Sequence, residues 1–214
     1  MTILITAGPT REPLDPVRYL SNRSSGKMGY ALAEAAAKEG HRVILISGPT
    51  ALDVPDGVDF VAVESAAEMH RVVSSHIAKC EVAIFAAAVA DYRPANFAEH
   101  KIKKTGEVLT VEFVRNPDIL GSARDEFGFE GVLVGFAAET RDLEENARQK
   151  LVRKKCDLVV ANDVSRRDIG FDSNENEVVL VYPEQAMPLP KDEKEHLAHR
   201  ILAAALELHA LASS

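Results

Sequence analysis

The chain has 214 residues, of which 46% are hydrophobic and 27% are charged, and its formal net charge at pH 7 is −8. This composition is that of a globular protein, and the length predicts a single domain over residues 1–214 with room for a small appendage. Domains that bind nucleic acid usually carry a basic face, so we expect no nucleic-acid partner. A local cluster of Lys and Arg can still bind a small anion.

The cysteines and the N-terminus indicate the compartment. Cys80 and Cys156 form no CxxC pair, and no His/Cys cluster has the spacing of zinc ligands, which favours a reducing compartment. The sequence begins MTILITAGPT, without a charged leader, and no apolar run approaches the roughly 20 residues that cross a bilayer. We therefore expect a cytoplasmic protein with no membrane partner.

Short apolar runs alternate along the chain with longer helical patterns. In chain order, strands are predicted at 3–7, 43–47, 60–63, 82–87, 131–136 and 158–161. Helices are predicted at about 25–39, 66–78, 117–126, 141–153 and 192–209. Several strands are apolar throughout, as strands buried on both faces are, and a late strand at 178–181 is expected to run antiparallel. The alternation predicts an α/β fold with a doubly wound, mostly parallel, Rossmann-like sheet.

Three local signals mark helix ends. Ser65, with Glu68 three residues later, predicts a capping box before the helix at 66–78. Gly40 follows the first helix, where a left-handed residue commonly ends a helix. Pro117 is predicted near the first position of its helix, where the missing N–H costs nothing.

Two segments interrupt the alternation. Residues 8–24 form a long loop rich in Arg, Asp and Asn, which suits carboxylate or phosphate recognition as well as a solvated loop. Residues 92–116 contain a basic patch followed by alternating polar and apolar residues at 108–113. That alternation predicts an antiparallel strand with one exposed face. We expect 92–116 to be an antiparallel arm outside the main sheet that carries a subunit interface.

The start of the first helix is a candidate phosphate site. Ser24 and Ser25, candidate caps, are followed by Gly26, Lys27, Met28 and Gly29, so unpaired N–H groups and a positive helix dipole meet small residues and a cation. A plain capped helix is the alternative. Two familiar phosphate motifs are missing: the Walker A pattern fails because Met28 follows Lys27, and no G-x-G-x-x-G follows the first strand.

Three further clusters can be read in two ways. Asp91 follows small residues at a strand end, where it can accept hydrogen bonds from a base or ribose or simply close a turn. The run Lys-Ile-Lys-Lys at 101–104 is either a solvated face or a phosphate contact. One helix face carries three cations that suit either the helix dipole or a triphosphate, namely Lys150, Arg153 and Lys154.

Taken together, these segments resemble phosphopantothenate–cysteine ligase, also called phosphopantothenoylcysteine synthetase. That enzyme is usually the C-terminal half of a bifunctional bacterial coenzyme A biosynthesis protein. The resemblance is carried by ITAGPTREPLDPVRYLSNRSSGKMG, AAAVADYRP, KIKK, RNPDIL, VGFAAET, RQKLVRKK, ANDV and GFDSNENEV. These motifs span nearly the whole chain in order, which makes a chance match negligible.

The resemblance implies a two-step reaction with CTP, 4′-phosphopantothenate and L-cysteine. The acid first forms 4′-phosphopantothenoyl-cytidylate with release of pyrophosphate. Cysteine then displaces CMP to give 4′-phosphopantothenoyl-cysteine. Mg²⁺ is expected with the nucleotide, and no flavin, because the flavin-dependent decarboxylase domain that normally precedes this one is absent from the chain. The chain is therefore expected to be a free-standing ligase, or to be part of or partner to such a decarboxylase. The sequence does not decide whether the nucleotide is CTP or ATP.

The resemblance also implies the site residues. Catalytic roles fall on Asn22, Lys101 and Arg18. The nucleotide would be bound by Phe85, Ala86, Ala87, Asp91, Lys101, Pro117, Asp118, Ile119, Leu120, Phe136, Lys150 and Lys154. The substrate and its phosphate would be bound by Ser24, Ser25, Gly26, Lys27 and Gly29. Metal ligands are not predicted.

The family's functional unit is a homodimer, so the arm at 92–116 is expected to cross to the other subunit and help to complete its site. Two other classes of protein fit the composition. A short-chain NAD(P) oxidoreductase would carry Tyr-x-x-x-Lys on a helix, and the chain has no such pair. A module that binds CTP without turnover remains an alternative, against which Lys101 and Asn22 argue.

Overall fold

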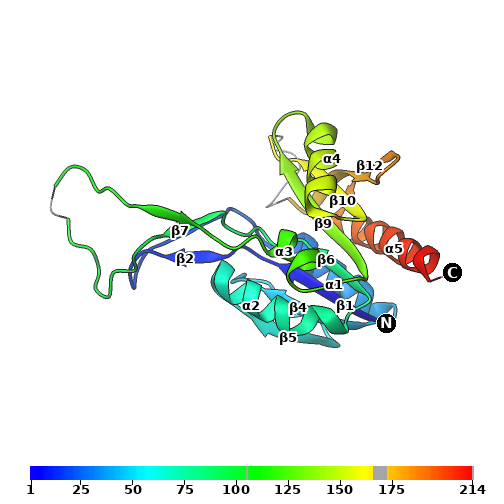
Figure 1. Ribbon diagram of the computed structural model, residues 1–214, viewed down its shortest axis with the longest axis horizontal. Helices are drawn as coiled ribbons and strands as arrows, with labels where there is room; N and C mark the ends of the chain where they lie inside the picture. The colour runs from blue at the N-terminus through cyan, green and yellow to red at the C-terminus, as the bar shows by residue number, and fades with distance from the viewer. Residues whose placement is uncertain (105, 166–172, 214) are drawn as a thin grey trace.

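The computed structural model describes residues 1–104, 106–165 and 173–213. Within them, the main sheet has eight strands (Figure 1). In spatial order these are β12 (Ala186–Glu193), β11 (Glu175–Val181), β10 (Leu158–Asp163), β9 (Val132–Glu139), β6 (Val82–Phe85), β1 (Thr2–Ala7), β4 (Arg42–Ser47) and β5 (Val58–Ala62). Every strand predicted for the main sheet is present, and the predicted antiparallel strand at 178–181 lies within β11. The sequence patterns did not predict β12.

Six of these strands are parallel, and β11 and β12 complete the sheet as antiparallel neighbours. The chain first builds outward from β1 to β4 and β5, and then returns to the other side of β1 to add β6, β9 and β10. The sheet is therefore doubly wound and Rossmann-like, as predicted. Its strand order reverses between β1 and β6, and in such sheets ligands bind outside the carboxyl ends of the strands at this point.

Helices cover both faces of the sheet. One core forms between the sheet, α1 (Lys27–Lys38) and α5 (Lys194–Ala212). The second core lies under α2 (Ala66–His76), α3 (Ile119–Asp125) and α4 (Leu143–Lys154), and the short helix η1 (Ile77–Lys79) continues α2. Because side chains alternate along a strand, Ile3 and Ile5 of β1 enter the first core and Leu4 enters the second.

The helix ends partly match the predicted signals. The capping box of Ser65 and Glu68 is present, and Gly40 has φ of 82° just after α1, so both predictions are confirmed. The predicted serine cap of α1 is wrong: the N-cap is Gly26 with φ of 80°, a left-handed conformation that glycine adopts without strain. Pro117 is not in the first helical turn either, because Asp118 is the N-cap of α3 and accepts the N–H of Gly121 at 2.9 Å.

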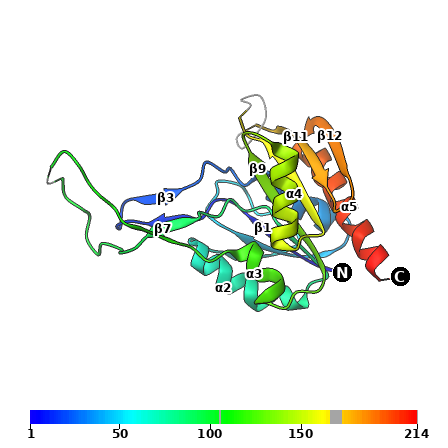
Figure 2. The same ribbon diagram turned by 45° about the horizontal axis from the view of Figure 1, so that its top comes forward.

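An arm projects from the end of the molecule at the carboxyl ends of β1 and β6 (Figures 1 and 2). It contains the hairpin of β2 (Arg11–Pro13) and β3 (Tyr19–Ser21) and the antiparallel pair β7 (Tyr92–Pro94) and β8 (Phe113–Arg115). Residues 92–116 lie outside the main sheet, as expected, but the β2–β3 hairpin in the segment expected to be a loop was not predicted, and the strand expected at 108–113 is mostly wrong. Residues 113–115 pair with β7 and Glu112 O accepts the N–H of Ala95, but Val108, nearer the tip of the arm, is 84% exposed.

Two further observations concern the compartment. Both cysteines, Cys80 and Cys156, are buried and free, and burial raises the pKa of the Cys156 thiol to about 12. None of the helices in the described part of the chain has the length and apolar character needed to span a membrane. The cytoplasmic location stays a prediction.

Candidate functional site

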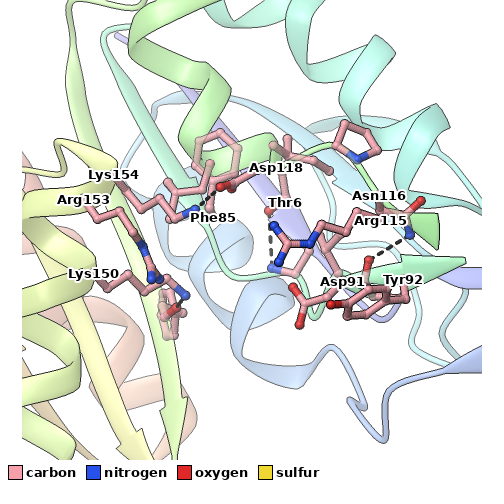
Figure 3. Close-up of a pocket in the computed structure, with 17 residues that line it drawn as sticks. Thr6, Phe85, Asp91, Tyr92, Arg115, Asn116, Asp118, Lys150, Arg153 and Lys154 are labelled. Carbon is pink, nitrogen blue, oxygen red and sulfur yellow. Dashed lines mark hydrogen bonds and ion pairs between the residues drawn. The ribbon is translucent and has the colours of Figure 1, made fainter. Parts of the chain in front are cut away.

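Two adjoining cavities lie where the strand order of the sheet reverses. The first has a volume of about 430 Å³ and is bounded by the ends of β1 and β6, the base of the arm, the start of α3 and the end of α4 (Figure 3). The second, of about 630 Å³, lies over the start of α1. Their shared wall consists of Ala87, Val89, Asp91, Phe136 and Lys150. A molecule in one cavity can therefore touch a molecule in the other.

The shared wall begins with the segment after β6, which the loop after β1 holds in place. Ala88 donates its N–H to Gly8 O at 2.9 Å and accepts the N–H of Thr10 at 3.2 Å. The Asn22 side-chain amide donates to Ala88 O at 3.0 Å and to Val89 O at 3.2 Å. Asn22 therefore lines the second cavity and also fixes the backbone that separates the two cavities.

The start of α1 forms the floor of the second cavity. Gly26 is the N-cap, and Gly29 lies so close to β1 that a Cβ on it would stand 2.5 Å from Ala7 Cβ. The helix therefore begins directly beside the end of β1, and residues 26–29 at its start line the cavity. An anion is favoured at such a helix start by unpaired donors and by the helix dipole.

Basic residues of α4 form one side of the first cavity, opposite Asp91, Tyr92 and Arg115 (Figure 3). Lys150 donates to Phe136 O at 2.5 Å, and Lys154 forms an ion pair with Asp118. Burial lowers the pKa of both lysines below the usual lysine range. This wall can therefore gain favourable charge interactions when an anion displaces water from it.

Arg115 and Asn116, at the base of the arm, were not predicted as site residues. The Asn116 side chain donates to Ala90 O at 2.8 Å, and its backbone N–H donates to Asp91 O at 2.8 Å. Arg93 donates to Arg115 O at 2.7 Å and to Asn116 Oδ1 at 3.1 Å. These bonds join the arm to the cavity wall, and the RNPDIL motif was the signal that could have indicated them.

Most residues predicted for the nucleotide lie around the first cavity. Its lining includes Phe85, Ala87, Asp91, Pro117, Asp118, Ile119, Leu120, Phe136, Lys150 and Lys154, while Ala86 lines the second cavity. The second cavity is also lined by the residues predicted for the substrate, namely Ser24, Ser25, Gly26, Lys27 and Gly29. Their roles stay predictions, but the structure brings them together.

Lys101 and Arg18 lie outside both cavities of the chain. Arg18 is at the turn of the β2–β3 hairpin, where it binds Asp15 and donates to Ile102 O at 3.0 Å. Lys101 is exposed in the adjacent segment of the arm. The second cavity instead has further polar lining residues that were not predicted, namely Glu139, Asn162, Asn176 and Lys194. Asn162 and Asn176 belong to the ANDV and GFDSNENEV motifs, and residues 170–172 of the latter lie outside the described residues.

Metal-binding groups are sparse around the cavities. Over the described ranges of the chain, no group of three or more His, Cys, Asp or Glu side chains could hold a metal ion by itself. The first cavity has Asp91 and Asp118 in its wall. Mg²⁺ typically needs only one or two carboxylates when phosphate oxygens and water supply its other ligands, so this wall fits an ion that arrives with a triphosphate.

The fold and the cavities define a Rossmann-like α/β protein with two adjoining cavities at the point where its strand order reverses. The chain belongs to the family described as DNA/pantothenate metabolism flavoprotein C-terminal domain, which matches residues 1–208. The coenzyme A biosynthesis bifunctional protein CoaBC of Vibrio cholerae is 50% identical over 202 residues, covering 94% of this chain and 51% of that protein. The CoaBC protein of Escherichia coli K12 is 48% identical over 205 residues, covering 94% and 50%.

Solved structures agree with this membership. The crystal structure of the C-terminal domain of a CoaBC protein is 41% identical, with a TM-score of 0.82, and the match covers 99% of this chain and 95% of that chain. A Cab2 mutant in complex with phosphopantothenate-cysteine shares the fold at 20% identity, with a TM-score of 0.77 and coverage of 98% and 86%. The resemblance to the ligase domain is thus confirmed. The chain spans about half the length of the curated relatives that it matches.

Proposed function

We propose that the chain is a phosphopantothenate–cysteine ligase of coenzyme A biosynthesis, with CTP as the activating nucleotide. It joins 4′-phosphopantothenate to L-cysteine through a 4′-phosphopantothenoyl-cytidylate. The observation that carries the proposal is the pair of cavities with a common wall at Asp91, Phe136 and Lys150. A reaction that joins an acid to a nucleotide needs two ligands side by side with their reacting groups at one boundary.

The nucleotide occupies the first cavity in this proposal. The backbone and small side chains of 85–91 and 117–120 enclose the base and ribose, and Asp91 accepts hydrogen bonds from them. Lys150 and Lys154 of α4 meet the phosphates. Burial disfavours the charged ammonium form and therefore lowers the pKa of both lysines. A nearby triphosphate would stabilise the charged form again, which supports this placement.

The acid occupies the second cavity. Its 4′-phosphate binds at the start of α1, among Ser24, Ser25 and the N–H groups that follow Gly26. Its carboxylate then reaches toward Asn22 and the shared wall. Because Asn22 already donates to Ala88 O and Val89 O, its remaining amide oxygen and the backbone it fixes determine where the acyl group lies.

The chemistry proceeds in two displacements. A carboxylate oxygen of the acid attacks the α-phosphorus of CTP, the bond to the β-phosphate breaks, and pyrophosphate leaves. The neutral amine of cysteine then attacks the acyl carbon, loses a proton, and expels CMP as the amide forms. Nucleotidylation is required because a free carboxylate has no adequate leaving group. The cations of α4 and Lys101 stabilise charge that develops on phosphate oxygens.

Mg²⁺ would be held by the triphosphate together with Asp91 and Asp118, and would neutralise phosphate charge. Lys154 and Asp118, which both line the first cavity, form an ion pair with each other. The chain's own residues thus provide both the carboxylates and the cations that a metal–nucleotide complex requires.

The functional unit in this proposal is a homodimer whose arms exchange contacts. Lys101 lies on the arm and away from the chain's own cavities, so a second copy is the means by which it reaches a nucleotide. Apolar side chains along the arm are exposed in the single chain, including Val17, Tyr19, Leu20, Tyr92, Phe97, Leu109 and Phe113. Exposed apolar surface of this kind is typical of an interface.

The test is pyrophosphate release upon addition of CTP, 4′-phosphopantothenate and cysteine. Lys101→Gln should keep its fold, since an exposed lysine adds little stability, and should release pyrophosphate at least about a hundredfold more slowly. Nucleotide binding without any pyrophosphate release by the wild-type dimer would instead identify a module that binds CTP without turnover. Normal release by folded Lys101→Gln would remove Lys101 from the mechanism.

A further inference from the structure

A buried carboxylate connects the two halves of the arm. Asp15, at the turn between β2 and β3, is only 2% exposed. Its Oδ1 accepts the N–H groups of Val17 and Arg18, each at 2.9 Å. Its Oδ2 accepts Arg18 Nε at 3.0 Å, Arg18 Nη2 at 2.5 Å and the backbone N–H of Ile102 at 3.1 Å. One oxygen therefore closes the hairpin turn, and the other holds the segment that contains Lys101.

The contact with Ile102 uses both of its backbone groups. Arg18 Nη2, held by Asp15, also donates to Ile102 O at 3.0 Å. Four residues earlier, the N–H of Ala98 donates to Leu14 O at 3.1 Å. We call residues 98–102 the strap. It is hydrogen-bonded to the hairpin turn at both of its ends, and the bonds at Ile102 fix the backbone next to Lys101.

The charge state of this contact is constant over ordinary pH. The guanidinium of Arg18 beside Asp15 holds the pKa of that carboxyl well below its usual range, and the N–H donors act in the same direction. Charge-assisted hydrogen bonds to a buried, ionised carboxylate are stronger than bonds between neutral groups. The strap is therefore attached by charge-assisted hydrogen bonds at Ile102 and by a neutral backbone bond at Ala98.

We propose that Asp15 is a positioning residue that sets the position of Lys101 for nucleotide activation by clamping Ile102, with Arg18 as the second half of the clamp. The inference rests on the role of Lys101 in the proposed function. In this clamp Arg18 has a structural task, because its Nη2 donates both to Asp15 and to Ile102 O. Asp15 does not touch the substrate; it acts through the backbone on which Lys101 is mounted.

The substitution Asp15→Asn separates the two tasks of the carboxylate. An asparagine oxygen can still accept the N–H groups of Val17 and Arg18, so the turn can close. Its NH₂ group then faces two other donors, the guanidinium of Arg18 and the N–H of Ile102, and it cannot accept a hydrogen bond from either. The clamp on the strap is lost while the volume of the side chain is kept. Glu107→Gln is the matched control, because it makes the same chemical change at an exposed position of the same arm.

The kinetic test is a double-mutant cycle on pyrophosphate release in a single turnover. A misplacement of about 1 Å can cost on the order of a hundredfold in rate, so Asp15→Asn should slow release by up to that factor. It should leave the affinity for CTP unchanged, whereas Glu107→Gln should change neither. Asp15→Asn combined with Lys101→Gln should be no slower than Lys101→Gln alone, because the first residue acts only through the second. Multiplied losses would overturn the proposal.

Hydrogen exchange tests the clamp without using activity. In Asp15→Asn the amides of Ala98 and Ile102 should exchange faster, while the amides of β1 and β6 should not change. Unchanged protection of Ile102 would overturn the proposal even if activity fell. Should wild-type protein release no pyrophosphate, the proposed function fails, and exchange still decides whether Asp15 holds the strap. If Asp15→Asn does not fold, Ile102→Pro removes the donated N–H, although it also replaces the side chain and fixes φ. Ile102→Ala, which keeps the N–H, is its control, and only the proline variant should slow release.

Discussion

Gly29 allows α1 to start in contact with β1, and Gly29→Ala should disturb both stability and substrate binding. A Cβ at this position would stand 2.5 Å from Ala7 Cβ, 3.1 Å from Ala7 Cα and 3.3 Å from Thr6 O. Two of these three atoms belong to the backbone and cannot rotate away. The helix must therefore move outward from the strand, and the N–H groups at its start move with it.

Two opposing terms determine the size of the effect. Alanine is favoured over glycine within a helix by about 1 kcal/mol. Overpacking of a tight core contact costs about 1–3 kcal/mol, and the 2.5 Å approach places this contact at the upper end of that range. The net loss in the free energy of unfolding should be about 2 kcal/mol. For a chain of this size, that loss lowers the melting temperature by about 4–8 °C.

A compensating substitution makes the test specific. Ala7→Gly removes the atom closest to the new methyl group, at its own cost of about 0.5–1 kcal/mol for glycine in a strand. Gly29→Ala with Ala7→Gly should therefore be more stable than the sum of the single changes predicts. Gly106→Ala is the control, since a Cβ there would meet nothing within 4 Å.

Urea unfolding gives the stabilities, and calorimetric titration gives the affinity for 4′-phosphopantothenate. The affinity should fall in Gly29→Ala more than in the double variant, because only the former displaces the helix start. If Gly29→Ala is as stable as the wild type, the close approach of α1 to β1 is wrong, and the reasoning about the floor of the second cavity fails with it.

Three further outcomes follow from the site and from the second core. CTP should raise the melting temperature as its concentration increases, and Asp91→Ala should reduce that rise; a larger rise with ATP would overturn the cytidine assignment. Burial lowers the pKa of Lys150 and a bound triphosphate raises it, so CTP should bind with proton uptake, and its affinity should fall as the pH rises from the free to the bound pKa. Calorimetry in buffers of different ionisation enthalpy measures this uptake, and its persistence in Lys150→Met would refute the assignment. Arg124→Met should cost about 3 kcal/mol in thermal unfolding, because Arg124 donates to Phe129 O, Gly131 O and Asp157 at 2.7–2.8 Å; a change below about 1 kcal/mol would contradict this reading.

Local sequence patterns predicted most of the main sheet for a physical reason. Strands buried on both faces must be apolar throughout, so 3–7, 43–47 and 158–161 stood out from their surroundings. Helices between them needed one apolar face, and their ends carried chemical signals such as Ser65 with Glu68. The failures occurred where pairing depends on distant chain. Residues 108–113 alternate like a strand, but among the described residues the strand pairing with β7 covers only 113–115, with one further backbone bond from Ala95 to Glu112 O.

Several candidate site residues could also be identified in the sequence, but their grouping could not. Small residues and glycines after strands marked 24–29 and 87–91 as ligand segments. Their arrangement around two cavities with a common wall depends on the strand order of the sheet, which places β6 beside β1. Asn22 illustrates the limit, because its amide binds Ala88 and Val89, which are 66 and 67 residues away along the chain.

The density of charged groups in 8–24 likewise had two interpretations in the sequence. The donors there suit a substrate anion. The residue types alone cannot distinguish substrate binding from hydrogen bonds made within the protein itself. Tertiary structure shows Arg18 bound to Asp15 and to the backbone of Ile102, on a hairpin that lies beside the strap.

The amino-acid sequence by itself thus determined most elements of the main sheet, their order, the kind of sheet and the residue types available for chemistry, because these depend on periodicity and on neighbours within a few positions. Only the tertiary structure decided which segments share a cavity, that Lys150 lies on the wall between the two cavities, and that the side chain of Asp15 holds Ile102. Those facts depend on contacts between residues far apart in the chain, and such contacts form only after the strands have taken their order in the sheet.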